Sequence, residues 1–200
     1  MKNSEQAYEN ALGLYNAGSY KGCLNTFLQL SAEGHAKSSF YAGSIYLKGA
    51  DGIERNETRA RELYGLALNQ EFLPGAALSV ALMEYQGKGG DKDYKSSMQH
   101  YLMVKGNPFA KIMICMMIQH GYGCESDEVA ALRWFEAAWS LGHPLGLKQA
   151  SYLYLRRGRF VNGIFGYLKS TLMLIWFYGI RKISILRAPN EVLGMGWKKR

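Results

Sequence analysis

Groups that could perform acid–base or metal chemistry are few and scattered in this 200-residue chain. Two of its four histidines, His35 and His143, each follow a glycine that occupies the same position in a repeating pattern described below. Metal centres and catalytic triads need histidines with partners at matched spacing, and the chain has no H-E-x-x-H, C-x-x-C or G-x-S-x-G motif. The sequence therefore predicts no catalytic residue, no metal site and no cofactor, and we expect a protein that is not an enzyme.

The segment G-K-G-G-D-K at residues 87–92 superficially suggests a phosphate-binding loop. A P-loop places four residues between its first glycine and a Gly-Lys-Ser/Thr, and this segment has neither that spacing nor the hydroxyl. We interpret it as a turn between two helices, because glycine turns recur at the same phase elsewhere in the chain.

Glycines that end a predicted helix recur at spacings of 31, 38, 34 and 37 residues. Their positions are Gly18, Gly49, Gly87, Gly121 and Gly158. Three of the four prolines, Pro74, Pro108 and Pro144, precede such glycines and open predicted helices, because a first-turn proline sacrifices no hydrogen bond. A period near 35 residues predicts an all-α array of helix pairs, in which each pair buries its apolar face against its neighbours.

The first helix of each pair has a packing position six residues before its glycine. In the middle units this position holds Gly43, Ala81 and Cys115, which are small enough for two helices to approach closely. At the two ends it holds Leu12 and Tyr152, and in the first unit the small residue is displaced to Gly13. We expect Cys115 to behave as a small buried hydrophobe.

The residues from Gly121 to Gly146 carry a specific pattern, G-Y-G-C-E-S-D-E-V-A-A-L-R-W-F-E-A-A-W-S-L-G-H-P-L-G. This segment resembles a Sel-one-like repeat, a tetratricopeptide-related helix pair with the pattern LGxxYxxGxGV followed by DxxxAxxWYxxAAxxG. The resemblance covers residues 7–158 and implies a right-handed α-solenoid. It further implies a bacterial protein-binding scaffold that acts beside envelope, polysaccharide or signalling machinery.

The positive charge of the chain is concentrated at its C-terminal end. Of 24 Lys and Arg and 16 Asp and Glu residues, eight basic residues and one acidic residue lie from residue 159 onward. The net charge is therefore +7 in residues 159–200 and +1 in residues 1–158. This asymmetry argues against a nucleic-acid partner for the whole protein, and it suggests two regions, a repeat solenoid at 1–158 and an apolar, basic tail at 159–200.

The start of the sequence is polar and contains no apolar signal-peptide core. Three cysteines, an odd number without paired spacing, fit a reducing compartment. We therefore expect a cytoplasmic protein that is not secreted. Peripheral attachment to the inner membrane is compatible with this expectation.

Residues next to the turn glycines are candidates for partner binding, because they should lie toward the surface formed by the first helices. This set is Tyr41, Lys48, Tyr85, Gln86, Gln119, His120 and Arg156. One alternative is a ligand-binding regulator or enzyme with a groove pocket around His120. The methionine-rich run at residues 110–118 is interpreted as a buried first helix, and its alternative is a deformable binding surface.

Residues 160–180 form a 21-residue segment with a single charge, Lys169. In its first half Phe160, Ile164, Phe165 and Leu168 share one side and polar or small residues share the other, a pattern that fits docking on the preceding helices. Three alternatives stay open: an internal cap, an interfacial contact with an anionic membrane, and a true span that Lys169 makes marginal. A further alternative is a structural subunit of a membrane complex. The predicted membrane or partner contacts are Leu172, Leu174, Ile175, Trp176, Phe177, Tyr178, Arg181 and Lys182.

Overall fold

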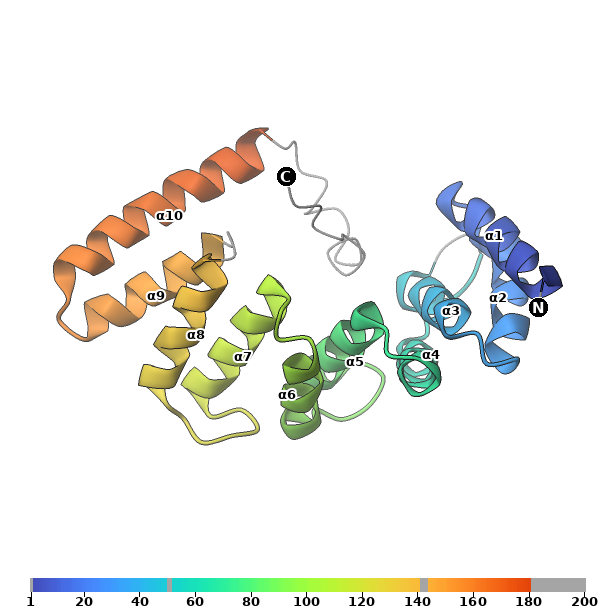
Figure 1. Ribbon diagram of the computed structural model, residues 1–200, viewed down its shortest axis with the longest axis horizontal. Coiled ribbons are helices and arrows are strands. Elements are labelled where there is room, and N and C mark those ends of the chain that lie inside the picture. The colour runs from blue at the N-terminus through green and yellow to red at the C-terminus, as the bar shows by residue number, and fades with distance from the viewer. Residues whose placement is uncertain (1, 50–51, 141–143, 181–200) are drawn as a thin grey trace. The chain divides into compact units, whose positions relative to one another are not determined.

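The computed structural model describes residues 2–49, 52–140 and 144–180 as a succession of α-helices (Figure 1). The chain divides into two compact units between Asp93 and Tyr94. The first unit contains α1 (Lys2–Asn16), α2 (Tyr20–Ala32), α3 (Ala36–Lys48), α4 (Glu57–Gln70) and α5 (Pro74–Gln86). The second contains α6 (Tyr94–Met103), α7 (Pro108–His120), α8 (Glu128–Ser140), α9 (Pro144–Arg156) and α10 (Phe160–Ile180). The predicted all-α fold of helix pairs is confirmed.

Proline and glycine define the ends of the first helices as predicted. Pro74, Pro108 and Pro144 are the first residues of α5, α7 and α9. Gly87 and Gly121 end α5 and α7 in the left-handed conformation, with φ of 71° at both. This conformation strains any residue that carries a Cβ, and it lets the cap amide bond a helix carbonyl.

The second glycine of each G-x-G turn permits a close contact with a preceding helix. A Cβ on Gly89 would overlap the carbonyl group of Glu57 at the start of α4, and one on Gly123 would overlap that of Tyr94 at the start of α6. Both glycines also have positive φ, 69° and 74°. The segment at 87–92 is therefore an inter-helix turn, as predicted.

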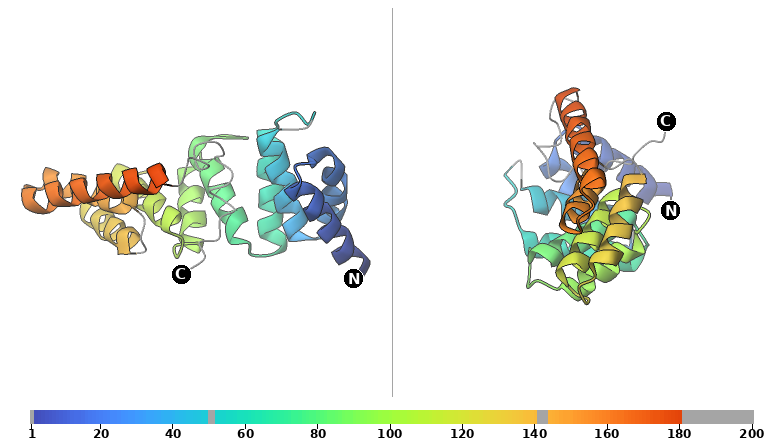
Figure 2. Two further views of the ribbon diagram at one scale, coloured as in Figure 1. Left: turned by 90° about the horizontal axis from the view of Figure 1, so that it is seen from above. Right: turned by 90° about the vertical axis from the view of Figure 1, so that its left-hand side faces the viewer.

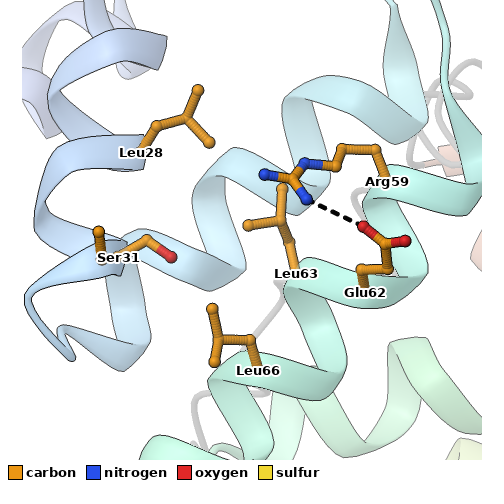
Figure 3. Close-up of a pocket in the computed structure, with 7 residues that line it drawn as sticks. Leu28, Ser31, Arg59, Glu62, Leu63 and Leu66 are labelled. Atoms are coloured by element: carbon orange, nitrogen blue, oxygen red, sulfur yellow. Dashed lines mark hydrogen bonds and ion pairs between the residues drawn. The ribbon is translucent and has the colours of Figure 1, made fainter.

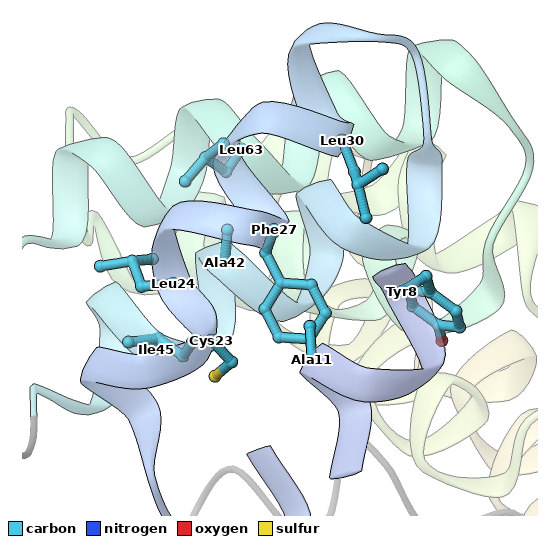
Figure 4. Close-up of a cluster of buried hydrophobic side chains, with 9 residues drawn as sticks. All are labelled: Tyr8, Ala11, Cys23, Leu24, Phe27, Leu30, Ala42, Ile45 and Leu63. Atoms are coloured by element: carbon cyan, nitrogen blue, oxygen red, sulfur yellow. The ribbon is translucent and has the colours of Figure 1, made fainter. Parts of the chain in front are cut away.

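Each unit has its own apolar core. In the first unit Phe27 of α2 lies at the centre of a cluster that α1, α3 and α4 complete, and its side chain is fully buried (Figure 4). In the second unit Phe135 of α8 packs with Cys115 of α7 and Leu153 of α9. The methionine-rich run lies in α7, where Met113 and Met117 are buried, so its interpretation as a core helix is confirmed.

The small packing position differs from the prediction at both ends of the array. In α9 the buried small residue is Ser151, whereas Tyr152 is more than half exposed. In α1 it is Ala11, and Gly13 is exposed with open space around it. The reason is that α1 and α9 each end one residue earlier relative to their glycine, so the packing position lies seven residues before it.

Cys115 is fully buried, and its thiol donates to the carbonyl of Lys111 at 2.8 Å. Burial raises the pKa of the Cys115 thiol. The predicted role of a small hydrophobe agrees with this environment.

We predict that Gly89→Ala lowers the free energy of unfolding by about 2 kcal/mol or more, because alanine adds a steric overlap to an unfavourable positive φ. Gly65, within α4, has no atom within 4 Å of a Cβ position. Gly65→Ala should therefore raise the free energy of unfolding by roughly 0.5–1 kcal/mol through helix propensity. Urea denaturation followed by circular dichroism measures both; equal effects of the two substitutions would contradict the packing role of Gly89.

We also predict that the stabilising effect of Tyr64 falls at high pH. Burial raises the pKa of Tyr64 to about 12 from an ordinary value of 10.0, although its hydrogen bond with Ser44 opposes this shift. Below pH 10 the phenol is neutral in both states, and between pH 10 and 12 it ionises first in the unfolded chain. The difference in free energy of unfolding between the wild type and Tyr64→Phe should shrink by up to about 1.4 kcal/mol per pH unit in that window. A difference that stays constant from pH 9 to pH 12 would show that Tyr64 ionises equally easily in the folded protein.

Candidate interaction surfaces

Two predicted partner-binding residues, Tyr41 and Lys48 of α3, belong to one surface of the first unit. The Lys48 ammonium donates to the hydroxyl of Tyr20 at 2.8 Å and lies 4.9 Å from the centroid of that ring. The ring of Tyr20 is 5.3 Å from Tyr15, and Tyr15 is 4.9 Å from Tyr41. We call Tyr15, Tyr20, Tyr41 and Lys48 the tyrosine patch.

The tyrosine patch is rigid at its base and partly open at its surface. Tyr41 stacks on the core residue Phe27 with a centroid separation of 5.5 Å. All three tyrosines are partly buried and Lys48 is exposed. Burial raises the pKa of Tyr15 to about 12 from an ordinary value of 10.0, and the neutral phenol can donate a hydrogen bond at physiological pH. The patch thus offers aromatic area, hydroxyl groups and one cation, which suits a protein partner better than a reaction.

Tyr15 and Tyr20 were not among the partner-binding residues predicted from the sequence. Tyr15 lies in the last turn of α1, and Tyr20 is the first residue of α2. The available signal was the recurrence of tyrosine near helix ends, but the fold is needed to bring α1, α2 and α3 together.

The remaining predicted residues do not form a single site. In the first unit Tyr85 is partly buried and Gln86 is exposed at the end of α5. In the second unit the Gln119 carbonyl accepts a hydrogen bond from the Ser126 hydroxyl at 2.8 Å. Arg156 is exposed and pairs with Glu128 of α8 at 2.6 Å. The last two contacts fix loops and helix ends within that unit.

His120 is exposed at the end of α7 and forms part of a stack of rings. Its ring centroid lies 5.6 Å from Tyr122, which stacks on Tyr94 at 4.6 Å with an interplanar angle of 11°. Within the described part of the chain, no three His, Cys, Asp or Glu side chains converge as metal ligands. His120 lines neither of the two pockets described below, and its ring contact is the stack with Tyr122.

A shallow groove lies between α2 and α4 of the first unit, with a volume of about 220 Å³ (Figure 3). Leu28 and Ser31 of α2 face Leu63 and Leu66 of α4 across it. At its edge Arg59 donates to Glu62 at 2.9 Å. A pocket of this size is smaller than ordinary small-molecule sites and fits one or two side chains of a partner. The sequence analysis did not identify it.

The predicted contact residues of the tail divide within α10. Leu172 and Ile175 are exposed, and Leu174 is partly buried. Trp176, Phe177 and Tyr178 lie in the helix, but their side chains, like the whole of Arg181 and Lys182, are outside the described residues. The exposed positions leave an apolar surface on the second unit.

α10 lies along α9 (Figures 1 and 2). The side of α10 that faces α9 is opposite to the one that its amphipathic pattern suggested. Its buried residues are Gly163, Gly166 and Ser170, whereas Phe160, Ile164, Phe165 and Leu168 are exposed. The physical reason is steric: Cβ atoms on Gly163 and Gly166 would overlap Leu155 and Ser151 of α9, so glycines allow the two helices to approach closely. No helix in the described part of the chain is both long enough and apolar enough to cross a membrane.

Comparisons with known proteins identify the same repeat. The model of the Sel1 repeat family matches residues 36–72, 74–103 and 108–143, which together are more than half of the chain. No curated protein sequence matches it.

Two solved structures share the fold. A Sel1 repeat protein from Oxalobacter formigenes has a TM-score of 0.72 at 22% sequence identity, and the match covers 85% of this chain and 73% of that one. A protective antigen present in uropathogenic Escherichia coli strains, which displays an SLR fold, has a TM-score of 0.66 at 24% identity. That match covers 75% of this chain and 33% of the antigen, so this chain spans about a third of its length. The two structures show the fold, and the matched repeats, which cover more than half of the chain, place it in the Sel1 repeat family.

Proposed function

We propose that this protein is a scaffold or adaptor that binds a protein partner through the tyrosine patch of its first unit. Sel1 repeat proteins are generally non-enzymatic scaffolds for protein–protein interaction, which supports the general role. The observation that carries the specific proposal is the meeting of Tyr15, Tyr20, Tyr41 and Lys48 from three different helices.

The physical chemistry of the patch favours binding for two reasons. Tyrosine rings bury a large area at a small cost in conformational entropy, because each has two rotatable bonds. The Lys48 side chain is already held against Tyr20 before a partner arrives, so less ordering is required on association. The matching partner surface is an apolar or aromatic segment that carries a carboxylate for Lys48.

We further propose that the scaffold acts in a bacterium, at the cytoplasmic face of the inner membrane or beside an envelope or polysaccharide assembly. The two solved structures described above come from bacteria, which supports the first part. The excess of basic residues from residue 159 onward supports attachment to an anionic surface.

The test is photo-crosslinking in the cell of origin, with benzoylphenylalanine in place of Lys48. Lys37 is the matched control position, because it is also an exposed lysine of α3 and is not a member of the patch. We expect a discrete protein adduct from position 48 that is absent from position 37. Tyr20→Ala should weaken the adduct roughly tenfold, since central aromatic residues of an interface carry much of its affinity.

An adduct of equal yield at both positions, or one that Tyr20→Ala leaves unchanged, would contradict binding through the patch. Circular dichroism of Tyr20→Ala verifies that the helices are retained, so that a loss of adduct reports on the surface.

A further inference from the structure

The outer face of α10 carries a row of exposed apolar side chains. Val161, Phe165, Leu168 and Leu172 are 81%, 70%, 58% and 67% exposed. They share one face because residues three or four apart on a helix lie above one another, and Ile164 and Ile175 extend the row. The intervening charged residue, Lys169, lies at the edge of this face. We call Val161, Phe165, Leu168 and Leu172 the apolar row.

The preceding second helices can be aligned with α10, and the alignment shows which positions of a second helix are exposed in this array. Each second helix has a small packing residue followed four positions later by an aromatic residue. These pairs are Cys23 and Phe27, Ala60 and Tyr64, Ser97 and Tyr101, Ala131 and Phe135, and Gly163 and Tyr167. The small residue is buried in all five pairs and the aromatic residue in the first four. α10 is therefore the fifth second helix, and its positions correspond one to one with those of α2, α4, α6 and α8.

In this register Val161, Phe165 and Leu172 occupy positions that are exposed in all four preceding second helices, whereas the position of Leu168 holds the partly buried Leu28 and Gly65 in α2 and α4. The position of Phe165 holds Asn25, Glu62, Gln99 and Arg133 in the four preceding second helices, and all four are exposed. The position of Val161 holds Lys21, Thr58, Lys95 and Val129, and that of Leu172 holds Ala32, Asn69, Gly106 and Ser140. All of these are exposed too, although each helix is followed by further repeats. Stacking another repeat on α10 would therefore leave Val161, Phe165 and Leu172 uncovered, so we look for a partner other than the next repeat.

The charges near the apolar row indicate which kind of partner would cover it. From Pro144 to Ile180 the sequence has no acidic residue and five basic ones: Lys148, Arg156, Arg157, Arg159 and Lys169. Of these, Arg156 is paired with Glu128 of α8. A second copy placed face to face would bring these like charges together, which disfavours a dimer through this surface. At an anionic lipid interface, in contrast, the apolar row would lie at the depth of the acyl chains and the cations at the level of the phosphates.

A groove beside the apolar row also combines apolar side chains with a cation. It lies between α8, α9 and α10, has a volume of about 280 Å³, and shares Val161 and Phe165 with the row. Its wall includes Trp139 and Leu147, and the Lys169 ammonium lies 5.3 Å from the centroid of the Trp139 ring. An apolar slot with one cation at its edge is suited to part of an acyl chain and its phosphate group.

We propose that the outer face of α10 docks the protein on an anionic lipid surface by inserting the apolar row among the headgroups. This inference deepens the proposed membrane attachment and is independent of partner binding by the tyrosine patch. Vesicle binding and crosslinking from Lys48 are separate measurements, so failure of one proposal is distinguishable from failure of the other.

The experiment is co-sedimentation of the full chain with phosphatidylcholine vesicles that contain or lack phosphatidylglycerol. We expect binding to the anionic vesicles that falls as salt rises, because surface cations contribute to it. The double substitution Val161→Glu and Leu168→Glu should lower the partition coefficient roughly tenfold or more, since charged side chains are expelled from the apolar layer. Lys169→Gln should reduce binding by about fivefold, and to anionic vesicles alone.

Phe72→Glu is the matched control, because Phe72 is a half-exposed apolar residue of the first unit and does not belong to α10. It should bind vesicles as the wild type does, and circular dichroism should show full helicity for all variants. The proposal is overturned by a failure of the wild type to bind anionic vesicles, or by binding that the double substitution leaves unchanged. Sedimentation equilibrium without lipid supplies a further decisive outcome: a dimer that the double substitution dissociates would assign the row to a second copy instead.

Discussion

The structure depends on close contact between a small residue of one helix and a bulky group of its neighbour. Gly43 of α3 is the clearest case, because a Cβ there would lie only 3.0 Å from the ring of Tyr64 in α4. Helices of 10 to 15 residues, the length of α1 to α9, are marginal alone in water, so each is stable only if its apolar side packs on the next. Small residues let the helix backbones approach, and the aromatic ring then fills the space between them. Repetition of this contact produces the array and leaves one side of each second helix permanently facing solvent.

The helix boundaries and the order of helix pairs followed from sequence because proline and glycine act locally. Pro74 and Pro108 fix where α5 and α7 begin, and Gly87 and Gly121 fix where they end, whatever lies around them. The packing register at the ends of the array was less predictable. One additional residue in the turn after α9 moves Ser151 into the small position and turns Tyr152 outward, and only the neighbouring helix decides between the two.

The docking side of α10 was mispredicted for a related reason. Hydrophobic periodicity shows which residues share a face, but the choice of buried face depends on how closely the partner helix can approach. Gly163 and Gly166 permit an approach to α9 that Phe165 and Leu168 would prevent. The tyrosine patch also shows that contacts between residues of different helices depend on how those helices pack. Tyr41 and Lys48 were identifiable from their place before a turn glycine, whereas Tyr15 and Tyr20 become neighbours only through the packing of α1 and α2 on α3.

The composition of α9 and α10 also distinguishes between two kinds of anionic partner. A nucleic acid would neutralise Arg157, Arg159 and Lys169, but it would leave the aliphatic side chains of the apolar row in water. Single strands bind through successive aromatic rings on which bases stack, and within the apolar row Phe165 alone offers such a ring. A lipid surface satisfies both groups together, because its phosphates and its acyl chains lie within one side-chain length of each other. The proposed lipid contact thus rests on the presence of cations beside the apolar row, more than on the net charge of +8.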